Sequence, residues 1–125
     1  MVLVTINKAK RLLYLSYIGH VDFQEMKRAR EDMPEILEQL PANVRVLGDL
    51  ERLESMDPAS ASEIGKVMDM LDQKGVEVSV RVIPDPSKDI GLKILALFHY
   101  RKKVRVVTCQ TMEEAAKELG FKGPP

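Results

Sequence analysis

The sequence predicts a small α/β protein with a mixed sheet of about five strands, in the order β-β-α-β-α-β-α-β-α. Short runs rich in Val, Ile and Leu recur along the chain, and stretches with apolar residues at helical spacing lie between most of them. The first two runs are separated by only a charged turn, which predicts an antiparallel hairpin. The later strands alternate with helices and should pair in parallel through right-handed crossovers.

Length and composition favour one globular domain, which we place at residues 1–120 with a short tail at 121–125. Hydrophobic residues make up 45% of the 125 positions, too many for a disordered chain. Basic and acidic residues number 19 each, which argues against nucleic-acid binding. No apolar run is long enough for a membrane span, and the first residues lack the layout of a signal peptide. These features predict a cytoplasmic protein.

The hairpin pairs Val2–Ile6 with Leu12–Ile18. Asp22 then opens a helix, because a side-chain acceptor followed three residues later by Glu25 forms a capping box. Pro34 lies inside the apolar stripe of this helix. Since proline removes a backbone hydrogen bond, we expect one kinked helix or two abutting ones.

The third strand covers Val44–Leu47, and a loop is expected over Leu50–Met56. Asp57 suits the N-cap of the second helix, and Pro58 suits its first helical position. Gly75 should end this helix.

The fourth strand, Val76–Ile83, alternates apolar and polar residues and should be half-buried. A third helix follows and ends in the basic run Arg101–Lys103, and the last strand covers Val104–Cys109. Thr111 and Glu114 form the capping box of a final helix that stops at Gly120. Polar residues interrupt three strands at alternate positions, which predicts one sheet face covered by helices and one partly open and charged; they are Arg45, Glu77, Ser79, Arg81 and Arg105.

Four features together resemble the STAS domain (sulphate transporter and anti-sigma-factor antagonist), in the SpoIIAA-like STAS/Sec14 group. An opening strand pair precedes the first helix. Val44–Leu50 resembles the family's strand that ends in an aspartate, here Asp49. Leu53–Asp57 resembles the loop that leads into the second helix, and Val106–Ala115 resembles the closing strand and helix. The resemblance implies a mixed sheet of about five strands with helices mainly covering one face.

The sequence departs from this family at the second helix. In anti-sigma-factor antagonists the loop reads Asp-Ser-Ser-Gly, and a partner kinase phosphorylates a serine there. Here the same positions read Asp57-Pro58-Ala59-Ser60, so only Ser60 offers a hydroxyl. The phosphorylation switch of the family is therefore not carried over, and Ser60 is left as the one candidate for modification.

The candidate binding residues are those of the loop and the second-helix start: Asp49, Glu54, Ser55, Asp57, Pro58 and Ser60. They follow a strand end, where open α/β sheets place their ligands. Clustered carboxylates can hold a cation or a basic partner. The simpler interpretation is that Asp57 caps its helix and the other side chains are solvated.

No catalytic, metal or cofactor motif is present. His20 and His99 are the only histidines, and neither has a Cys, His or acidic partner at ligand spacing. Cys109 excludes an internal disulfide and ends an apolar run, as an inert thiol does. Phosphate-binding loops and nucleophile elbows are absent from the sequence. The sequence thus argues against an enzyme and predicts neither a metal nor a cofactor.

Two functions stay open. The first is a non-enzymatic regulatory domain that binds an unidentified protein through the Asp57-Pro58 loop and the second helix, with a homodimer left open and Tyr14 and Tyr17 as further interface candidates. The second is a small-ligand or lipid carrier of the Sec14 type, which needs an apolar cavity lined by residues such as Ile90, Ile94 and Phe98. Both rest on fold analogy.

Overall fold

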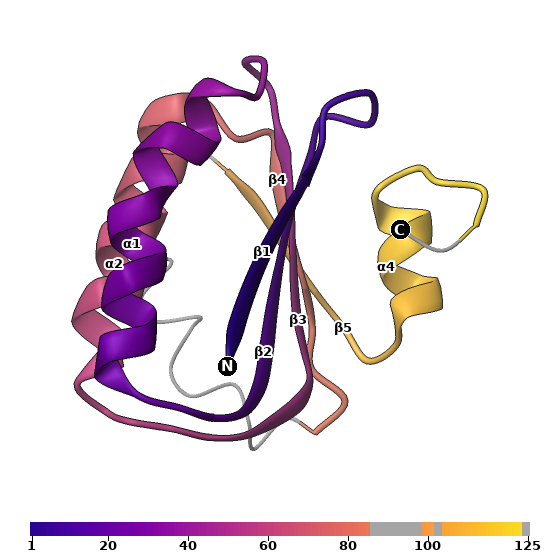
Figure 1. Ribbon diagram of the computed structural model, residues 1–125. Coiled ribbons are helices and arrows are strands. Elements are labelled where there is room, and N and C mark those ends of the chain that lie inside the picture. Colours follow the sequence, from indigo (N-terminus) through magenta and orange to yellow (C-terminus); the bar gives the residue numbers. More distant parts are fainter. Residues whose placement is uncertain (86–98, 102–103, 124–125) are drawn as a thin grey trace.

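The protein is a mixed five-stranded sheet with helices on both faces (Figure 1), seen in a computed structural model that describes residues 1–85, 99–101 and 104–123. The strands lie in the order β1-β2-β3-β4-β5, with β1 antiparallel to β2 and the other pairs parallel. This architecture confirms the predicted sheet. The third predicted helix, with Ile90, Ile94 and Phe98, lies outside the described residues. The bounds are β1 Val2–Asn7, β2 Leu12–Val21, α1 Phe23–Glu38, β3 Arg45–Met56, α2 Ser60–Lys74, β4 Val78–Val82, β5 Arg105–Cys109 and α4 Met112–Glu118.

Figure 1 shows α1 and α2 side by side on one face of the sheet and α4 on the opposite face. The larger apolar cluster lies under α1 and α2, and its fully buried side chains include Leu13, Met26 and Met33. The smaller cluster lies under α4 and contains Leu12 and Val80. Two of the three described helices therefore cover one face, as expected.

Local chemistry sets the starts of α1 and α4 and the end of α2 where the sequence predicts them. The Asp22 carboxylate accepts a hydrogen bond from the Glu25 N–H at 2.8 Å and caps α1. The Thr111 hydroxyl accepts one from the Glu114 N–H at 3.1 Å and caps α4. Gly75 ends α2 with a φ of 90°, a left-handed conformation that favours glycine.

Pro34 lies within α1, which is one continuous helix of 16 residues. The alternative of two abutting helices is therefore wrong. Met33 and Leu37, on either side of the proline, are buried against the sheet. This packing offsets the hydrogen bond that the proline removes, because most helical stability in proteins comes from the buried apolar face.

The fourth strand is buried on both faces, so the prediction of a half-buried strand was wrong. Val80 packs toward α4, whereas Ser79 and Arg81 point to the α1/α2 side and are about as buried as the valines. Arg45 and Arg105 do lie on the α4 side, where Arg105 pairs with Glu118 at 3.1 Å. The alternating polar residues of β3 and β4 thus face opposite sides of the sheet, and no single charged face results.

The third strand is 12 residues long, so the prediction of a loop over Leu50–Met56 was wrong. Leu50 and Leu53 are both 1% exposed, and β2 is long enough to pair with this segment to its end. Two register shifts between β2 and β3 bend the pair. Leu50 and Leu53 are three positions apart and would face opposite sides of a regular strand, but the register shifts let both reach the same core. Local sequence does not reveal these shifts.

Residues after α4 pack back on the sheet. The Phe121 N–H donates to the Ala116 carbonyl at 2.9 Å, and its ring lies 4.6 Å from the Arg45 guanidinium and 4.8 Å from the Lys10 ammonium. The Arg45 guanidinium also donates to the backbone carbonyls of Leu119 and Lys10. The first residue of the expected tail is therefore part of the packed structure.

Candidate functional site at the carboxyl ends of two parallel strands

Strands β2 and β3 continue together well beyond β4. The last β3–β4 pair is Asp49 with Val82, whereas the β2–β3 pairing runs on to Val21 with Met56. The carboxyl ends of these two strands project where α2 begins. We call this region the β2–β3 edge, meaning the carboxyl-terminal end of these two interior strands and not an outer strand of the sheet. It is defined by His20, Glu54, Ser55, Asp57 and Pro58.

At this edge the His20 Nδ1 atom lies 2.7 Å from the Ser55 hydroxyl oxygen. Both side chains are exposed, and the two residues are directly paired across β2 and β3. A hydroxyl hydrogen-bonded to an imidazole provides the nucleophile and the base of a catalytic triad, whose third member is an orienting acid. Within the described part of the chain no carboxylate forms an ion pair with His20, so the orienting acid of a triad is not supplied.

Asp57 holds the crossover from β3 to α2. Its N–H donates to the Val21 carbonyl at 2.9 Å, and its carboxylate accepts from the Ala59 N–H at 3.1 Å. The helix itself begins at Ser60, and its N-cap, Ala59, has no side-chain hydrogen bond. The prediction that Asp57 is the N-cap and Pro58 the first helical residue was therefore wrong by two positions. The Asp57 carboxylate still pairs a backbone donor, but in the turn before the helix.

Ser60 is fully buried at the start of α2. Its hydroxyl has no hydrogen-bond partner among the residues that the structure describes. A kinase could reach it only if the first turn of α2 opened. Exposed hydroxyls near this point come instead from Ser55 and Ser62.

Asp49 does not join the β2–β3 edge. It lies eight positions before Asp57, a difference of about 26 Å along extended chain. Its carboxylate accepts from the Tyr14 hydroxyl at 2.8 Å and from the Glu51 N–H at 2.9 Å. Burial, followed by the hydrogen bond to Asp49, raises the pKa of Tyr14 to about 12. The pair lines a shallow surface hollow of about 380 Å³ on the α4 side.

Of the two interface candidates among the tyrosines, Tyr17 is buried in the larger cluster and cannot meet a partner. Burial raises the pKa of Tyr17 to about 12. Tyr14 is half-buried and stays accessible on the other face.

Sequence reasoning missed a buried ion pair that joins α1 to α2. Glu63 is 3% exposed, and its carboxylate lies 2.6 Å from the Arg30 Nε atom and 3.4 Å from the Lys66 ammonium. The hydrogen bond from Arg30 lowers the pKa of Glu63. The two residues are 33 positions apart, so only the crossing of the helices brings them together.

His99 also has an acidic partner that sequence spacing did not reveal. Its Nδ1 atom lies 2.7 Å from the Asp69 carboxylate on α2. The ring lies over Gly65, where an added Cβ would come within 2.6 Å of the His99 Nε2 atom. Glycine is therefore required at this position for the imidazole to approach the helix.

Within the residues that the structure describes, no group of three or more histidine, cysteine or acidic side chains is arranged to hold a metal ion. None of the described helices is long and apolar enough to cross a membrane.

Comparisons with known proteins identify the architecture. No family model matches the sequence, and no curated protein matches it. Among solved structures, the unphosphorylated form of the anti-sigma factor antagonist SpoIIAA superposes with a TM-score of 0.66 at 15% identity and covers 96% of this chain and 98% of its own. The phosphorylated form of the Bacillus cell fate determinant SpoIIAA gives 0.63 at 16% identity, covering 95% and 99%.

An uncharacterised DUF3478 protein from Shewanella loihica PV-4, with a SpoIIAA-like fold, superposes with a TM-score of 0.69 at 9% identity. It covers 95% of this chain and 92% of its own. At such identities the likeness is one of fold, and nearly the whole length of each chain takes part in it. The chain therefore has a SpoIIAA-like fold.

Proposed function

We propose that this chain is a non-enzymatic regulatory domain that binds another protein through the β2–β3 edge. The observation that carries the proposal is the exposure of Glu54, Ser55 and Pro58 on a backbone fixed by the Asp57 hydrogen bonds. A rigid edge loses little conformational entropy on binding. Glu54 and Asp57 give the edge negative charge, which suits a partner with basic side chains.

The proposal includes loss of the phosphorylation switch. By the resemblance to anti-sigma-factor antagonists, Pro58 and Ala59 occupy the two positions at which those proteins have serines. Neither residue can accept a phosphate. Ser60, the remaining hydroxyl of this stretch, is buried. We infer that association with the partner depends on its concentration or on its own state, and not on phosphorylation of this loop.

A variant that carries a photo-crosslinking amino acid in place of Pro58 should capture the partner when it is expressed in the native host. The same amino acid at Glu35, an exposed residue on α1, is the control position. A protein captured at Pro58 and absent at Glu35 is then purified for binding measurements. Equal capture at the two positions would contradict the proposal.

Two Asp57 variants separate charge from stability in those measurements. Asp57→Asn keeps the acceptor for the Ala59 N–H and removes the charge, so it should weaken partner binding while the unfolding midpoint stays close to wild type. Asp57→Ala also removes the acceptor, and its free energy of unfolding should fall by about 1 kcal/mol. Calorimetric titration and urea unfolding of both variants test this. Unchanged affinity in Asp57→Asn would count against the charged edge.

The alternative, a small-ligand or lipid carrier, needs an apolar cavity. The hollow that described residues line beneath α2, among them Tyr17, Met68 and Tyr100, has a volume of about 40 Å³. This volume suits about one water molecule, far below the few hundred Å³ of a typical ligand site. Native mass spectrometry of protein purified without added ligand decides the matter: a retained small molecule, absent from a denatured control, would favour the carrier.

A further inference from the structure

The outer edge of β1 presents backbone groups for another strand. Ile18 N–H donates to the Met1 carbonyl at 2.8 Å, and the Met1 nitrogen donates to the Ile18 carbonyl at 2.6 Å, so these two residues form a hydrogen-bonded pair. Such pairs alternate along antiparallel strands. The N–H and carbonyl groups of Val2, Val4 and Ile6 therefore point away from β2, toward the edge.

This edge lacks the features that protect edge strands elsewhere. Within Val2–Asn7 there is no proline and no charged side chain, and the register with β2 is continuous. Leu3 is 46% exposed, and it is among the few large apolar side chains of the described residues that reach the surface. The opposite edge strand, β5, carries Arg105 in an ion pair with Glu118. An apolar, unprotected edge is the usual site for pairing with another strand.

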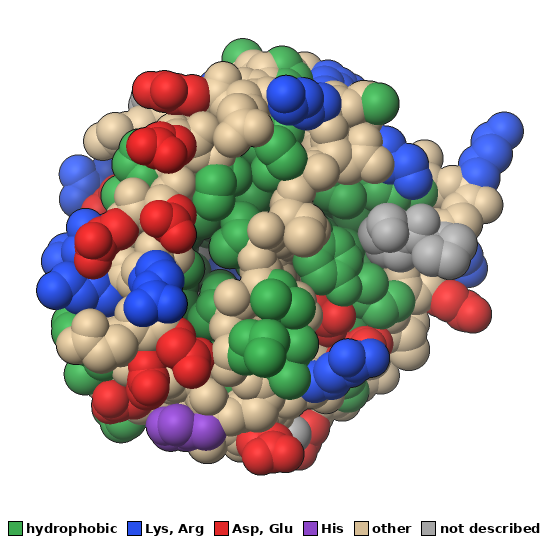
Figure 2. All heavy atoms as spheres, viewed as in Figure 1, with side chains coloured by type: hydrophobic (Ala, Val, Ile, Leu, Met, Phe, Trp, Pro, Cys, Tyr) green, Lys and Arg blue, Asp and Glu red, His purple; other side chains and the backbone are tan. Residues whose placement is uncertain are grey.

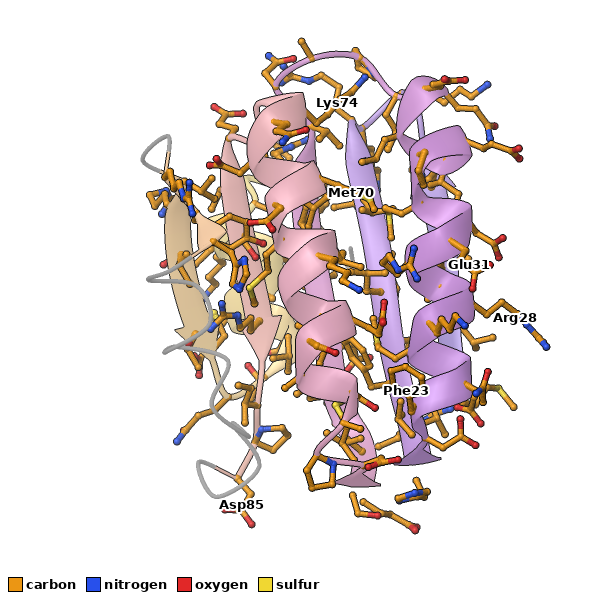
Figure 3. All side chains as sticks on the ribbon, turned by 90° about the vertical axis from the view of Figure 1, so that its left-hand side faces the viewer. Phe23, Arg28, Glu31, Met70, Lys74 and Asp85 are labelled. Carbon is orange, nitrogen blue, oxygen red and sulfur yellow. The ribbon has the colours of Figure 1, made fainter. Side chains whose placement is uncertain are left out.

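A groove runs beside this edge, between β1 and α1. It has a volume of about 420 Å³, with Val2, Val4 and Ala29 in its lining. Charges of both signs border it, from Arg28 and Asp32 on α1. Figure 3 shows Arg28 projecting from α1 on the side away from α2. Side chains from an added strand would therefore enter an apolar groove with a charged border.

We propose that a second copy of this chain pairs with β1, antiparallel and across a two-fold axis through Val4. In this register Val2 lies opposite the partner's Ile6, and the two Val4 residues face each other. All outward backbone groups of the two strands are then used, in about six hydrogen bonds. The two sheets join into one continuous sheet, a closed, isologous dimer.

Charge complementarity favours a second copy over an unrelated peptide. The two-fold axis places the two α1 helices antiparallel to each other on the same face of the joined sheet, one on either side of the axis. Ala29 lines the groove together with Val4 near the axis, so Arg28 of one copy lies toward Asp32 of the other, and the pair forms twice. The chain has no formal net charge, so its copies do not repel one another over long range.

Backbone pairing is tested with substitutions at Val4, followed by analytical ultracentrifugation over a range of protein concentrations. Val4→Pro removes an outward N–H but no hydrogen bond to β2, and it should weaken dimerisation by roughly 100-fold. Val4→Thr keeps the N–H and the β-branched shape and should stay dimeric. Circular dichroism confirms that both variants fold. A dimer that persists in Val4→Pro would overturn the proposal.

Charge reversal tests the identity of the occupant. Arg28→Glu and Asp32→Arg should each weaken self-association by about tenfold, because each brings like charges together twice. An equimolar mixture of the two variants restores opposite charges in both pairs. Native mass spectrometry, which resolves the two masses, should then show mainly the mixed dimer.

A statistical mixture of dimers would overturn the two-fold register, since that result means the two side chains do not meet. Wild-type protein that stays monomeric up to about 0.5 mM would overturn the dimer itself. These outcomes are independent of the β2–β3 edge, because neither Val4 nor the α1 charges belong to it.

Discussion

The face of the sheet under α1 and α2 buries polar side chains inside a large apolar cluster, whereas the face under α4 is a smaller apolar cluster with an arginine at its border. Glu63, Ser79 and Arg81 lie within the first. On the second, Arg45 reaches the end of α4 and lies against Phe121. Figure 2 shows apolar side chains still visible on the surface between the two layers of helix.

This difference shows that a polar residue in a strand does not mark the solvent side. Ser79 and Arg81 are buried because β4 is a central strand with helices on both faces. Arg45 is only half-buried because it reaches the border of the smaller layer. The position of a strand in the sheet, more than its own alternation, decides which polar residues are buried.

Two adjacent leucines on β2 give the sharpest comparison of the faces. Among the residues that the structure describes, Leu13 belongs to a cluster of 19 buried residues and Leu12 to one of eight, so the cavity at Leu13 has less freedom to collapse. Leu13→Ala should lower the free energy of unfolding by about 4 kcal/mol and Leu12→Ala by about 2.5 kcal/mol. Urea unfolding monitored by circular dichroism measures both. Equal losses would mean that the two clusters are packed equally firmly.

The border of the α4 face is tested at Arg45. Arg45→Met keeps much of the apolar stem but removes the bonds to the Leu119 and Lys10 carbonyls and the contact with Phe121, so stability should fall by about 2 kcal/mol. Hydrogen exchange of α4 amides should rise more than that of α1 amides. Lys27→Met, at a half-buried cation of α1, is the control and should change stability little.

The smallest change in the free energy of unfolding is expected on replacing Tyr14 or Tyr17, which lie on opposite faces of the sheet. Tyr14→Phe loses the hydrogen bond to Asp49 and should cost about 1 kcal/mol at neutral pH. Tyr17→Phe should cost less, because the Tyr17 hydroxyl makes no hydrogen bond within the described residues. Differential scanning calorimetry compares them.

The raised pKa values of Tyr14 and Tyr17 also predict how the free energy of unfolding changes with pH in the alkaline range. Their folded-state pKa of about 12 lies above the ordinary value of 10, so the folded protein holds these protons more tightly. The stability they contribute is complete below pH 10 and is lost as the pH rises toward 12. Each Phe variant should lose less stability than wild type in this window. Tyrosinate absorbance that appears near pH 10 in the folded protein would contradict the raised pKa values of these tyrosines.

Local chemistry made much of this fold predictable. Asp22 and Thr111 cap their helices as their spacing with Glu25 and Glu114 predicts, and Gly75 ends α2. Each of these features depends on residues within a few positions of one another. The hairpin and the order of the elements follow from the same kind of signal.

The candidate site was less predictable because its geometry is set by pairing over long distances. The continuation of β3 to Met56 depends on the length of β2, and it separates Asp49 from Asp57. The His20–Ser55 contact comes from the same pairing. Glu54, Ser55, Asp57 and Pro58 could be grouped from the sequence because they are close along the chain, whereas the burial of Ser60 depends on the packing of α2.

The contact between Arg45 and Leu119 spans 74 residues and fixes the order in which the molecule can be completed during synthesis. The chain leaves the ribosome from its N-terminus, and the residues of β1 to α2 precede α4 by many positions. The large cluster can therefore assemble while α4 is still being made. Val78, Val80 and Val82 stay uncovered on their α4 side until α4 emerges, which leaves this strand open to chaperone binding and aggregation in the nascent protein.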